Sequence, residues 1–283
     1  MDMLAPRRAG AVGASLLRRA AAILALAVVI AAPAYAAESS ALARARMLYN
    51  AGNYDGAIDA ASVARRQPQS ADAAALIMGR AQLERYRQKA DPDDLADARQ
   101  TLSTVHMSAL TARDQSDLLI GLGQSLYLGE VFGPAAELFA TALDRGTLMN
   151  AHDRARLLDW WATALDREAQ SLPPERRPPL YDRILARMDD EVHRDPGNAA
   201  ANYWLAVAAR GAGDLDRAWD AAIAAWVRAM LSPATADSLR TDIDRLVTQA
   251  LVPERARLRS QHDQQDAVTS LRAEWDLVKQ QWK

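Results

Sequence analysis

The chain has 283 residues, with 34 basic and 36 acidic side chains, no cysteine, and apolar residues at half of its positions. This composition is typical of a folded globular protein, and the lack of cysteine excludes disulfides, thiolate zinc sites and the acylated cysteine of a bacterial lipoprotein. Alanine, the strongest helix former and a small packing residue, is frequent throughout, and no segment alternates in the manner of a strand. The sequence therefore predicts an all-α protein with closely packed helices.

Residues 1–36 have the features of a bacterial secretory signal. A region with four arginines precedes an apolar stretch from Ala20 to Ala32, and Ala34-Tyr35-Ala36 offers the small residues that a signal peptidase accepts. The stretch is short for a membrane-spanning helix. The alanines after Arg18-Arg19 favour the general secretory route over twin-arginine export. We expect cleavage after Ala36, export to the periplasm and no stable membrane insertion, and an uncleaved membrane anchor is the alternative.

The rest of the chain is mildly acidic. Residues 1–36 hold four arginines and one aspartate, so the remaining chain carries a net charge of −5. Nucleic-acid binding depends on the neutralisation of phosphates by basic side chains. The sequence therefore predicts that nucleic acid is not a partner.

The clearest internal repeat unit covers residues 116–149. It reads Leu119-x2-Leu122-Gly123-x2-Leu126, followed by Phe132, Ala135-x3-Phe139 and Ala142-Leu143. Small residues at Gly123 and Ala135 let two antiparallel helices cross closely, and the larger residues fill the grooves beside them. This pattern resembles the tetratricopeptide repeat. The resemblance implies a right-handed α–α superhelix of stacked helix pairs.

The same register extends over residues 38–231 and gives about five helix pairs. The first helices of three other pairs carry a large residue followed by a small one, as in Met78-Gly79, Trp161-Ala162 and Leu205-Ala206. Insertions lengthen the second and fourth units, and the fourth includes the proline-rich segment 173–179. We interpret this segment as a connector, with a polyproline stretch presented to a partner as the alternative. A related helical solenoid is the alternative for the fold.

Helix boundaries and the C-terminal region complete the expected organisation. Asp91-Pro92 and Ser232-Pro233 have the pattern of an N-cap followed by proline, and Thr111 with Asp114 resembles a capping box. Three further helical segments are expected at 235–251, 253–259 and 266–282. Residues 232–283 are predicted to cap the solenoid, with an apolar stripe formed by Leu271, Trp275 and Val278.

The chain offers no pattern for catalysis or for binding a metal or cofactor. Its four histidines, at positions 106, 152, 193 and 262, are far apart and lack metal-binding spacing, so surface or helix-end positions are expected. Asp91, Asp93 and Asp94 lack the glycine and late glutamate of a calcium loop, so helix capping is the expected role. We therefore expect no metal, no cofactor and no enzymatic activity.

The resemblance implies where a partner binds. In tetratricopeptide proteins the first helix of each pair lines an inner groove that holds an extended peptide or a partner's helix. Several of these positions here carry tyrosine, tryptophan or arginine, the types that dominate binding hot spots. For Trp160 and Trp204, packing between repeats is an equal alternative. The groove residues implied by the resemblance are Arg46, Tyr49, Asn50, Arg80, Gln124, Tyr127, Arg156, Asp159, Trp160, Arg167, Tyr203, Trp204 and Arg210.

The function expected from the sequence is that of a periplasmic adaptor or scaffold. It would hold an acidic or mixed extended segment of a cell-envelope protein in the groove. The alternative is a helical module of, or accessory to, an enzyme that acts on cell-wall or glycan material. Glycan cleavage requires two carboxylates at a fixed separation, and the sequence singles out no such pair. The partner, the pathway and the oligomeric state are left open.

Overall fold

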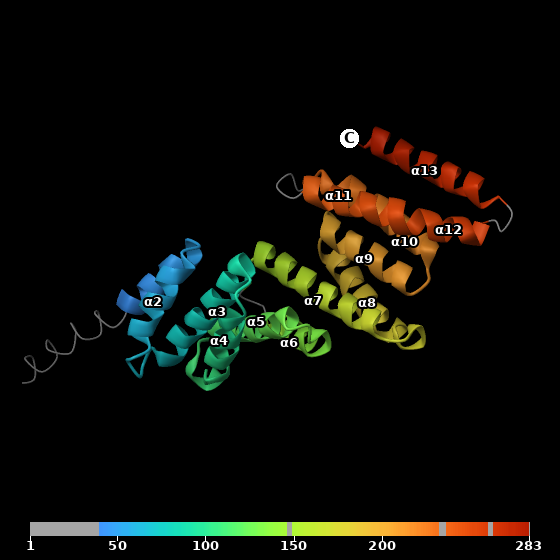
Figure 1. The fold of residues 1–283 in the computed structure, drawn as a ribbon. Coiled ribbons are helices and arrows are strands. Elements are labelled where there is room, and N and C mark those ends of the chain that lie inside the picture. The colour runs from blue at the N-terminus through green and yellow to red at the C-terminus, as the bar shows by residue number, and fades with distance from the viewer. Residues whose placement is uncertain (1–39, 146–148, 232–235, 260–262, 283) are drawn as a thin grey trace, which may run out of the picture. The chain divides into compact units, whose positions relative to one another are not determined.

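The computed structural model describes residues 40–145, 149–231, 236–259 and 263–282, and every regular element in these ranges is helical (Figure 1). The predicted signal segment 1–36 and the predicted cap at Ser232 lie outside the described residues. The chain divides into two compact units, Met1–Asp114 and Gln115–Lys283. Within the described ranges, no helix is long and apolar enough to cross a membrane. The prediction of an all-α protein is confirmed for this part of the chain.

The first unit consists of short helices packed through small side chains. After a helix over residues 40–50, α3 packs against both α2 and α4. Ala45, Ala61, Ala64 and Ala74 are fully buried in the core that joins the first three helices. Such small residues allow the helix backbones to approach closely. The elements of this unit are α2 (Tyr54–Ala64), α3 (Ala71–Lys89), α4 (Pro92–Ser103) and the 3₁₀ turn η1 (Met107–Ala109).

In the second unit, each helix packs against the next along the chain. Helix α5 begins just before the division between the units, and contacts follow in the order α6–α7, α7–α8, α8–α9 and α9–α10. The elements are α5 (Ala112–Leu128), α6 (Phe132–Arg145), α7 (Ala151–Ser171), η2 (Pro174–Arg176), α8 (Pro178–Arg194), α9 (Ala199–Gly211), α10 (Leu215–Ala229), α11 (Ala236–Leu246), η3 (Val247–Leu251), α12 (Val252–Arg259) and α13 (Gln264–Gln281). This arrangement matches the predicted succession of helix pairs.

Small residues lie at the helix crossings, as the repeat pattern predicts. A Cβ atom added to Gly123 would lie 2.5 Å from Cε1 of Phe139, so α5 and α6 cross at this glycine. A Cβ atom added to Gly79 would lie 2.6 Å from Cγ of Leu102, which joins α3 to α4. Ala135 is fully buried on α6. The predicted helix pairing is confirmed for α5 and α6, which form the described part of the unit up to Arg145.

Three turns between paired helices share one backbone hydrogen-bond pattern. The amides of Asn53, Val131 and Asp214 each donate to the carbonyl five residues earlier, at 2.9 Å. The residue before each has a left-handed φ, which is 74° at Gly52, 62° at Glu130 and 87° at Gly213. Each of these residues donates to the carbonyl three residues earlier, which completes a Schellman motif. The backbone therefore repeats in the first, third and fifth helix pairs.

Two predicted connectors take a definite form. Asp91 caps α4 by accepting a hydrogen bond from the amide of Asp93, as predicted, and α3 extends to Lys89 before it. In the proline-rich segment, Pro174–Arg176 forms a 3₁₀ turn and α8 starts at Pro178. The prolines therefore serve as a connector and a helix start, as the favoured interpretation has it.

The C-terminal region differs from the prediction in one respect. We expected separate helices at 235–251 and 253–259, but α11, the π-helical η3 and α12 form one continuous run. Pro253 has no amide hydrogen to donate, and the wider π turn before it lets the chain pass through the proline without ending the helix. Leu271 and Trp275 of α13 are buried, as predicted for a capping helix. The ring of Trp275 packs against Trp219 and Trp226 of α10.

Candidate partner-binding groove

The predicted groove residues of the second unit lie on α5, α7 and α9. Helix α9 contacts both α7 and α11. The indole Nε1 of Trp204 donates to Oδ1 of Asp159 at 3.0 Å and so joins α9 to α7. The guanidinium of Arg210 donates to both carboxylate oxygens of Glu254, from Nε at 3.0 and 3.1 Å, and so joins α9 to α12. These bonds link α9 to its neighbour α7 and to α12 of the C-terminal region.

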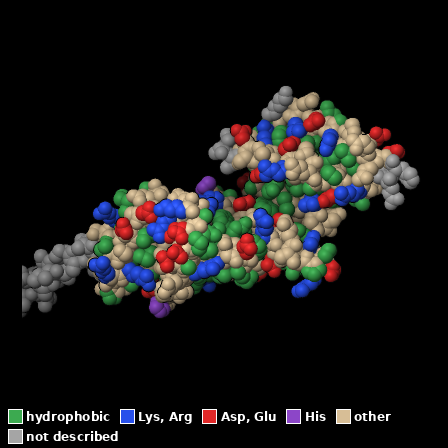
Figure 2. Space-filling view, in the orientation of Figure 1, with side chains coloured by type: hydrophobic (Ala, Val, Ile, Leu, Met, Phe, Trp, Pro, Cys, Tyr) green, Lys and Arg blue, Asp and Glu red, His purple; other side chains and the backbone are tan. Residues whose placement is uncertain are grey.

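An aromatic and acidic surface lies across these helices. We name it the α9 surface and define it by Asp159 and Asp166 of α7, Tyr203 of α9 and Asp242 of α11. Figure 2 shows hydrophobic side chains over α9, at the bottom of the hollow between α7 and α11. Tyr203 is half-buried and packs edge-to-face on Trp204, with ring centroids 5.4 Å apart. The hollow therefore has an aromatic residue with acidic groups from the two flanking helices.

The carboxylates of the α9 surface affect one another and the tyrosine. Burial raises the pKa of Tyr203 to about 12, and the charges of Asp242, Asp159 and Asp166 contribute in that order. Burial also raises the pKa of Asp159, more than the hydrogen bond from Trp204 lowers it, and the charge of Asp242 adds to the rise. All three carboxylates therefore lie within electrostatic reach of one phenol ring.

Asp166 is held in place but not neutralised by an ion pair. It accepts hydrogen bonds from the hydroxyl of Tyr181 at 3.3 Å and from Nε2 of Gln170 at 2.6 Å. Burial raises its pKa, and the bond from Tyr181, the charges of Arg167 and Arg210, and the bond from Gln170 offset the rise only in part. Within the described residues, neither Asp166 nor Asp159 forms an ion pair, while Asp242 pairs with Arg245 of its own helix at 3.2 Å. The surface keeps negative charge that the described chain does not compensate by direct contact.

Other predicted groove residues of this unit pack inside the protein. Gln124 and Trp204 are 8% and 7% exposed, so they are not available as partner contacts. The ring of Trp160 packs edge-to-face on Tyr127 at 4.8 Å and near Phe139 at 6.0 Å. Both tryptophans thus take part in packing, Trp204 as a buried residue and Trp160 as a partly buried one. Of the predicted arginines on α7, Arg156 and Arg167 are exposed.

In the first unit, the predicted groove residues bind one another or their neighbours. Arg46 donates to Oδ2 of the buried Asp114 at 3.0 Å. The guanidinium carbon of Arg80 lies 4.9 Å from the ring centroid of Tyr49. Asn50 is exposed at the end of its helix. Arg46, Tyr49 and Arg80 therefore have contacts within the first unit.

The comparisons with known proteins give no family: no protein-family model matches the chain, and no curated protein matches it. The chemistry of the site is therefore argued from its own residues. In the described ranges, no group of three or more histidine, aspartate or glutamate side chains is placed to hold a metal ion. His106, His152 and His193 are exposed, as predicted, and His262 lies outside the described residues.

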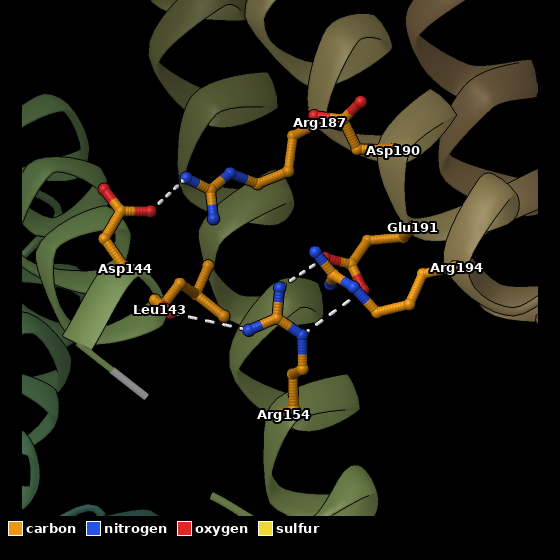
Figure 3. A pocket seen from close by; sticks show the side chains of 7 residues that line it. All are labelled: Leu143, Asp144, Arg154, Arg187, Asp190, Glu191 and Arg194. Atoms are coloured by element: carbon orange, nitrogen blue, oxygen red, sulfur yellow. Dashed lines mark hydrogen bonds and ion pairs between the residues drawn. The ribbon is translucent and has the colours of Figure 1, made fainter. Parts of the chain in front are cut away.

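The sequence analysis missed a buried ion-pair cluster between α7 and α8. Arg154 of α7 and Arg194 of α8 both donate to Glu191, which is 5% exposed (Figure 3). Burial raises the pKa of Glu191, but the hydrogen bonds from the two arginines outweigh burial and leave that pKa lowered. Arg187 pairs with Asp144 at 2.6 Å. Arg194 and Glu191 are three residues apart on α8, but the pairs Arg154–Glu191 and Arg187–Asp144 are 37 and 43 residues apart, and no local pattern relates them.

The cluster borders a cavity of about 580 Å³. Leu143, Asp144, Arg154, Arg187, Asp190, Glu191 and Arg194 line it. Three arginines face three acids, so the cavity has balanced charge, and two of those acids are engaged by the arginines. The sequence analysis also missed a similar pair in the first unit, where Arg85 binds the buried Asp94. We interpret both clusters as ionic links between packed helices rather than as binding sites.

Proposed function

We propose that this chain is an exported adaptor or scaffold of the bacterial cell envelope, built of tetratricopeptide-like helix pairs. It acts by binding, and it holds a segment of a partner protein against the α9 surface. The observation that carries the proposal is that α9 packs against both α7 and α11, with Trp204 of α9 bonded to Asp159 of α7 and the half-buried Tyr203 beside it. The shared Schellman turns support stacked repeats, whose successive first helices form continuous binding surfaces.

Site-specific photocrosslinking tests the location of binding. A photoreactive amino acid is placed in the full chain at Arg156 or Arg167, which are exposed on α7. Matched positions on second helices are Glu137 of α6 and Asp220 of α10, which are also exposed. After irradiation of cells, the α7 positions are expected to crosslink to one defined envelope protein, and the second-helix positions are not. Equal crosslinking from all four positions would exclude the first-helix surface as the binding site.

The same cells test the proposed export. Mass spectrometry of the protein from the envelope fraction should give Ala37 as the first residue, because cleavage is expected after Ala36. If the protein in the membrane fraction begins at Met1, the N-terminal segment is an uncleaved membrane anchor and not a cleaved signal.

A further inference from the structure

The second helices of three successive pairs, α6, α8 and α10, are joined by ion pairs. In each ion pair the acid lies on the earlier helix and the arginine on the later one. We name these pairs the outer ladder: Glu137–Arg183 at 2.7 Å and Asp144–Arg187 at 2.6 Å between α6 and α8, and Asp189–Arg217 at 2.7 Å between α8 and α10. In the described ranges, no backbone packing comparable to that between α7 and α9 joins α6 to α8 or α8 to α10. Long arginine side chains therefore span the distance between these helices.

The first helices α5, α7 and α9 are joined in a different way. The ring centroids of Tyr127 and Trp160 lie 4.8 Å apart between α5 and α7. Between α7 and α9, the buried Trp204 donates its indole hydrogen to Asp159, and α9 also packs against α11. Added salt screens the attraction between exposed charges, but it does not screen contacts between apolar surfaces. The two sides of the second unit are therefore held by interactions that respond differently to salt.

The acids of the outer ladder are open to solvent. The side chains of Glu137, Asp144 and Asp189 are 62, 66 and 42% exposed. Arg187, which reaches toward Asp144 in Figure 3, is 24% exposed, and its guanidinium lies 5.2 Å from the ring centroid of Trp161. The Debye length falls from about 10 Å at 0.1 M salt to about 3 Å at 1 M, which is close to the length of these ion pairs. Dissolved ions therefore reach the carboxylates and compete with the arginines.

We propose that the outer ladder makes the curvature of the second unit depend on ionic strength. The packed first helices are the fixed side, and the ion pairs limit the separation of α6, α8 and α10. When salt screens the ladder, the second helices move apart and the hollow between α7 and α11 narrows. A water-separated ion pair is longer than a direct one by roughly one water diameter, about 3 Å. Exposed ion pairs contribute little to the free energy of folding, so the ladder acts on shape more than on stability.

The change in curvature gives the hollow two shapes. Hydrophobic side chains over α9 lie at its bottom, and a segment held there would gain or lose contacts as α7 and α11 approach (Figure 2). The inference goes beyond the proposed function, because the bending needs no partner. A chain exported as proposed would meet the salt concentration outside the cytoplasm, which changes with the surroundings of the cell.

Distances between pairs of spin labels on the full chain test the inference. Because the sequence has no cysteine, the labels attach only to introduced cysteines. Thr141→Cys on α6 with Asp220→Cys on α10 gives the outer distance, and Arg156→Cys on α7 with Thr241→Cys on α11 gives the inner distance across the hollow; all four positions are exposed. Pulsed electron paramagnetic resonance is measured from about 0.1 to about 1 M NaCl. The outer distance should lengthen by about 3 Å for each of its two steps, and the inner distance should shorten.

A variant without the ladder acids should have the high-salt shape at low salt. The ladder variant Glu137→Gln/Asp144→Asn/Asp189→Asn keeps the size of all three side chains and removes their charges. At the lowest salt concentration, its outer distance should equal that of the parent chain at the highest. Further salt should change this distance little.

A matched variant separates the ladder from a general effect of charge. Asp182→Asn/Asp266→Asn/Glu274→Gln removes the same number and types of exposed acids, from α8 and α13, outside the ladder. Its outer distance should depend on salt as that of the parent does. Far-UV circular dichroism should show the same helical content in all variants.

An outer distance in the parent chain that stays constant across this range of salt would overturn the inference, and this result does not depend on how the triple variants fold. Equal outer distances in the ladder variant and the matched variant at low salt would also overturn it. If the outer and inner distances lengthened together, salt would loosen the whole unit instead of bending it, and the inference would be wrong. Absence of the specific crosslinks together with salt-dependent bending would count against the adaptor function alone.

Discussion

Glu130 occupies a backbone position that a glycine occupies in two equivalent turns. Its φ of 62° lies in the left-handed region, as do those of Gly52 and Gly213 at the same place in the first and fifth pairs. The left-handed conformation costs a residue with a Cβ roughly 1–2 kcal/mol, while glycine adopts it freely. The third turn therefore forms the same hydrogen bonds with a glutamate where the other two turns have a glycine. Because the residue type differs, the sequence alone did not show that this turn is repeated.

Substitution at these two turns should have opposite effects. Glu130→Gly removes the unfavourable backbone conformation and is expected to raise the free energy of unfolding by about 0.5–1 kcal/mol. Gly213→Ala places a residue with a Cβ atom in the left-handed conformation and is expected to lower the free energy of unfolding by about 1 kcal/mol. The added Cβ atom has no neighbour within 4 Å, so this cost comes from the backbone alone. Urea denaturation of both variants measures these changes. A destabilised Glu130→Gly variant would mean that the glutamate side chain, not the backbone, determines this turn.

Residue-level prediction was accurate where the signal is local. The cap at Asp91 depends on a short-range preference, and the crossing at Gly123 depends on a recurring spacing. The link between Arg154 and Glu191 depends on tertiary packing across 37 positions, and the sequence contains too many acids and arginines to choose that pair. The same holds for the bond between Arg210 and Glu254, which lie 44 residues apart in the sequence.

At the level of elements, the α5–α6 crossing is the clearest case in which spacing determines packing. Phe139 is fully buried, and its ring occupies the space beside the missing side chain of Gly123. The motif identified both residues because the requirement for a small and a large partner recurs with the helix period. By contrast, the continuous run from α11 to α12 was missed because a proline such as Pro253 normally ends a helix. The π turn before it has no sequence signature.

A double-mutant cycle tests this crossing. Gly123→Ala should cost about 1–3 kcal/mol, because the new methyl group overlaps the ring of Phe139. Phe139→Ala should cost about 3–5 kcal/mol through the cavity that it leaves. In the Phe139→Ala background, Gly123→Ala should become nearly neutral, because the methyl group then enters the cavity. Additive costs in urea denaturation would show that the two residues are not in contact.

At the level of the whole molecule, stability in a helical repeat protein is expected to depend mainly on contacts between neighbouring elements. The C-terminal helix illustrates such a contact. Trp275 of α13 is 1% exposed, donates to Oδ1 of Asp244 at 2.8 Å, and packs against two tryptophans of α10. Helix α13 therefore covers the last apolar face of the second unit, which is the role predicted for the C-terminal region.

Trp275→Ala should destabilise the second unit without affecting the first. Truncation of a buried tryptophan costs about 3–5 kcal/mol, and the loss should be largest for the helices that contact it. Amide hydrogen exchange followed by mass spectrometry should show reduced protection from α10 to α13, with residues 40–114 unchanged. Trp282→Ala is the matched control, because this tryptophan is 38% exposed and its backbone carbonyl, which accepts from Trp226 and Arg240, is retained. It should leave protection as in the wild type. A uniform loss of protection in both units of the Trp275→Ala variant would mean that the chain unfolds as one cooperative body, and nearest-neighbour stability would not describe it.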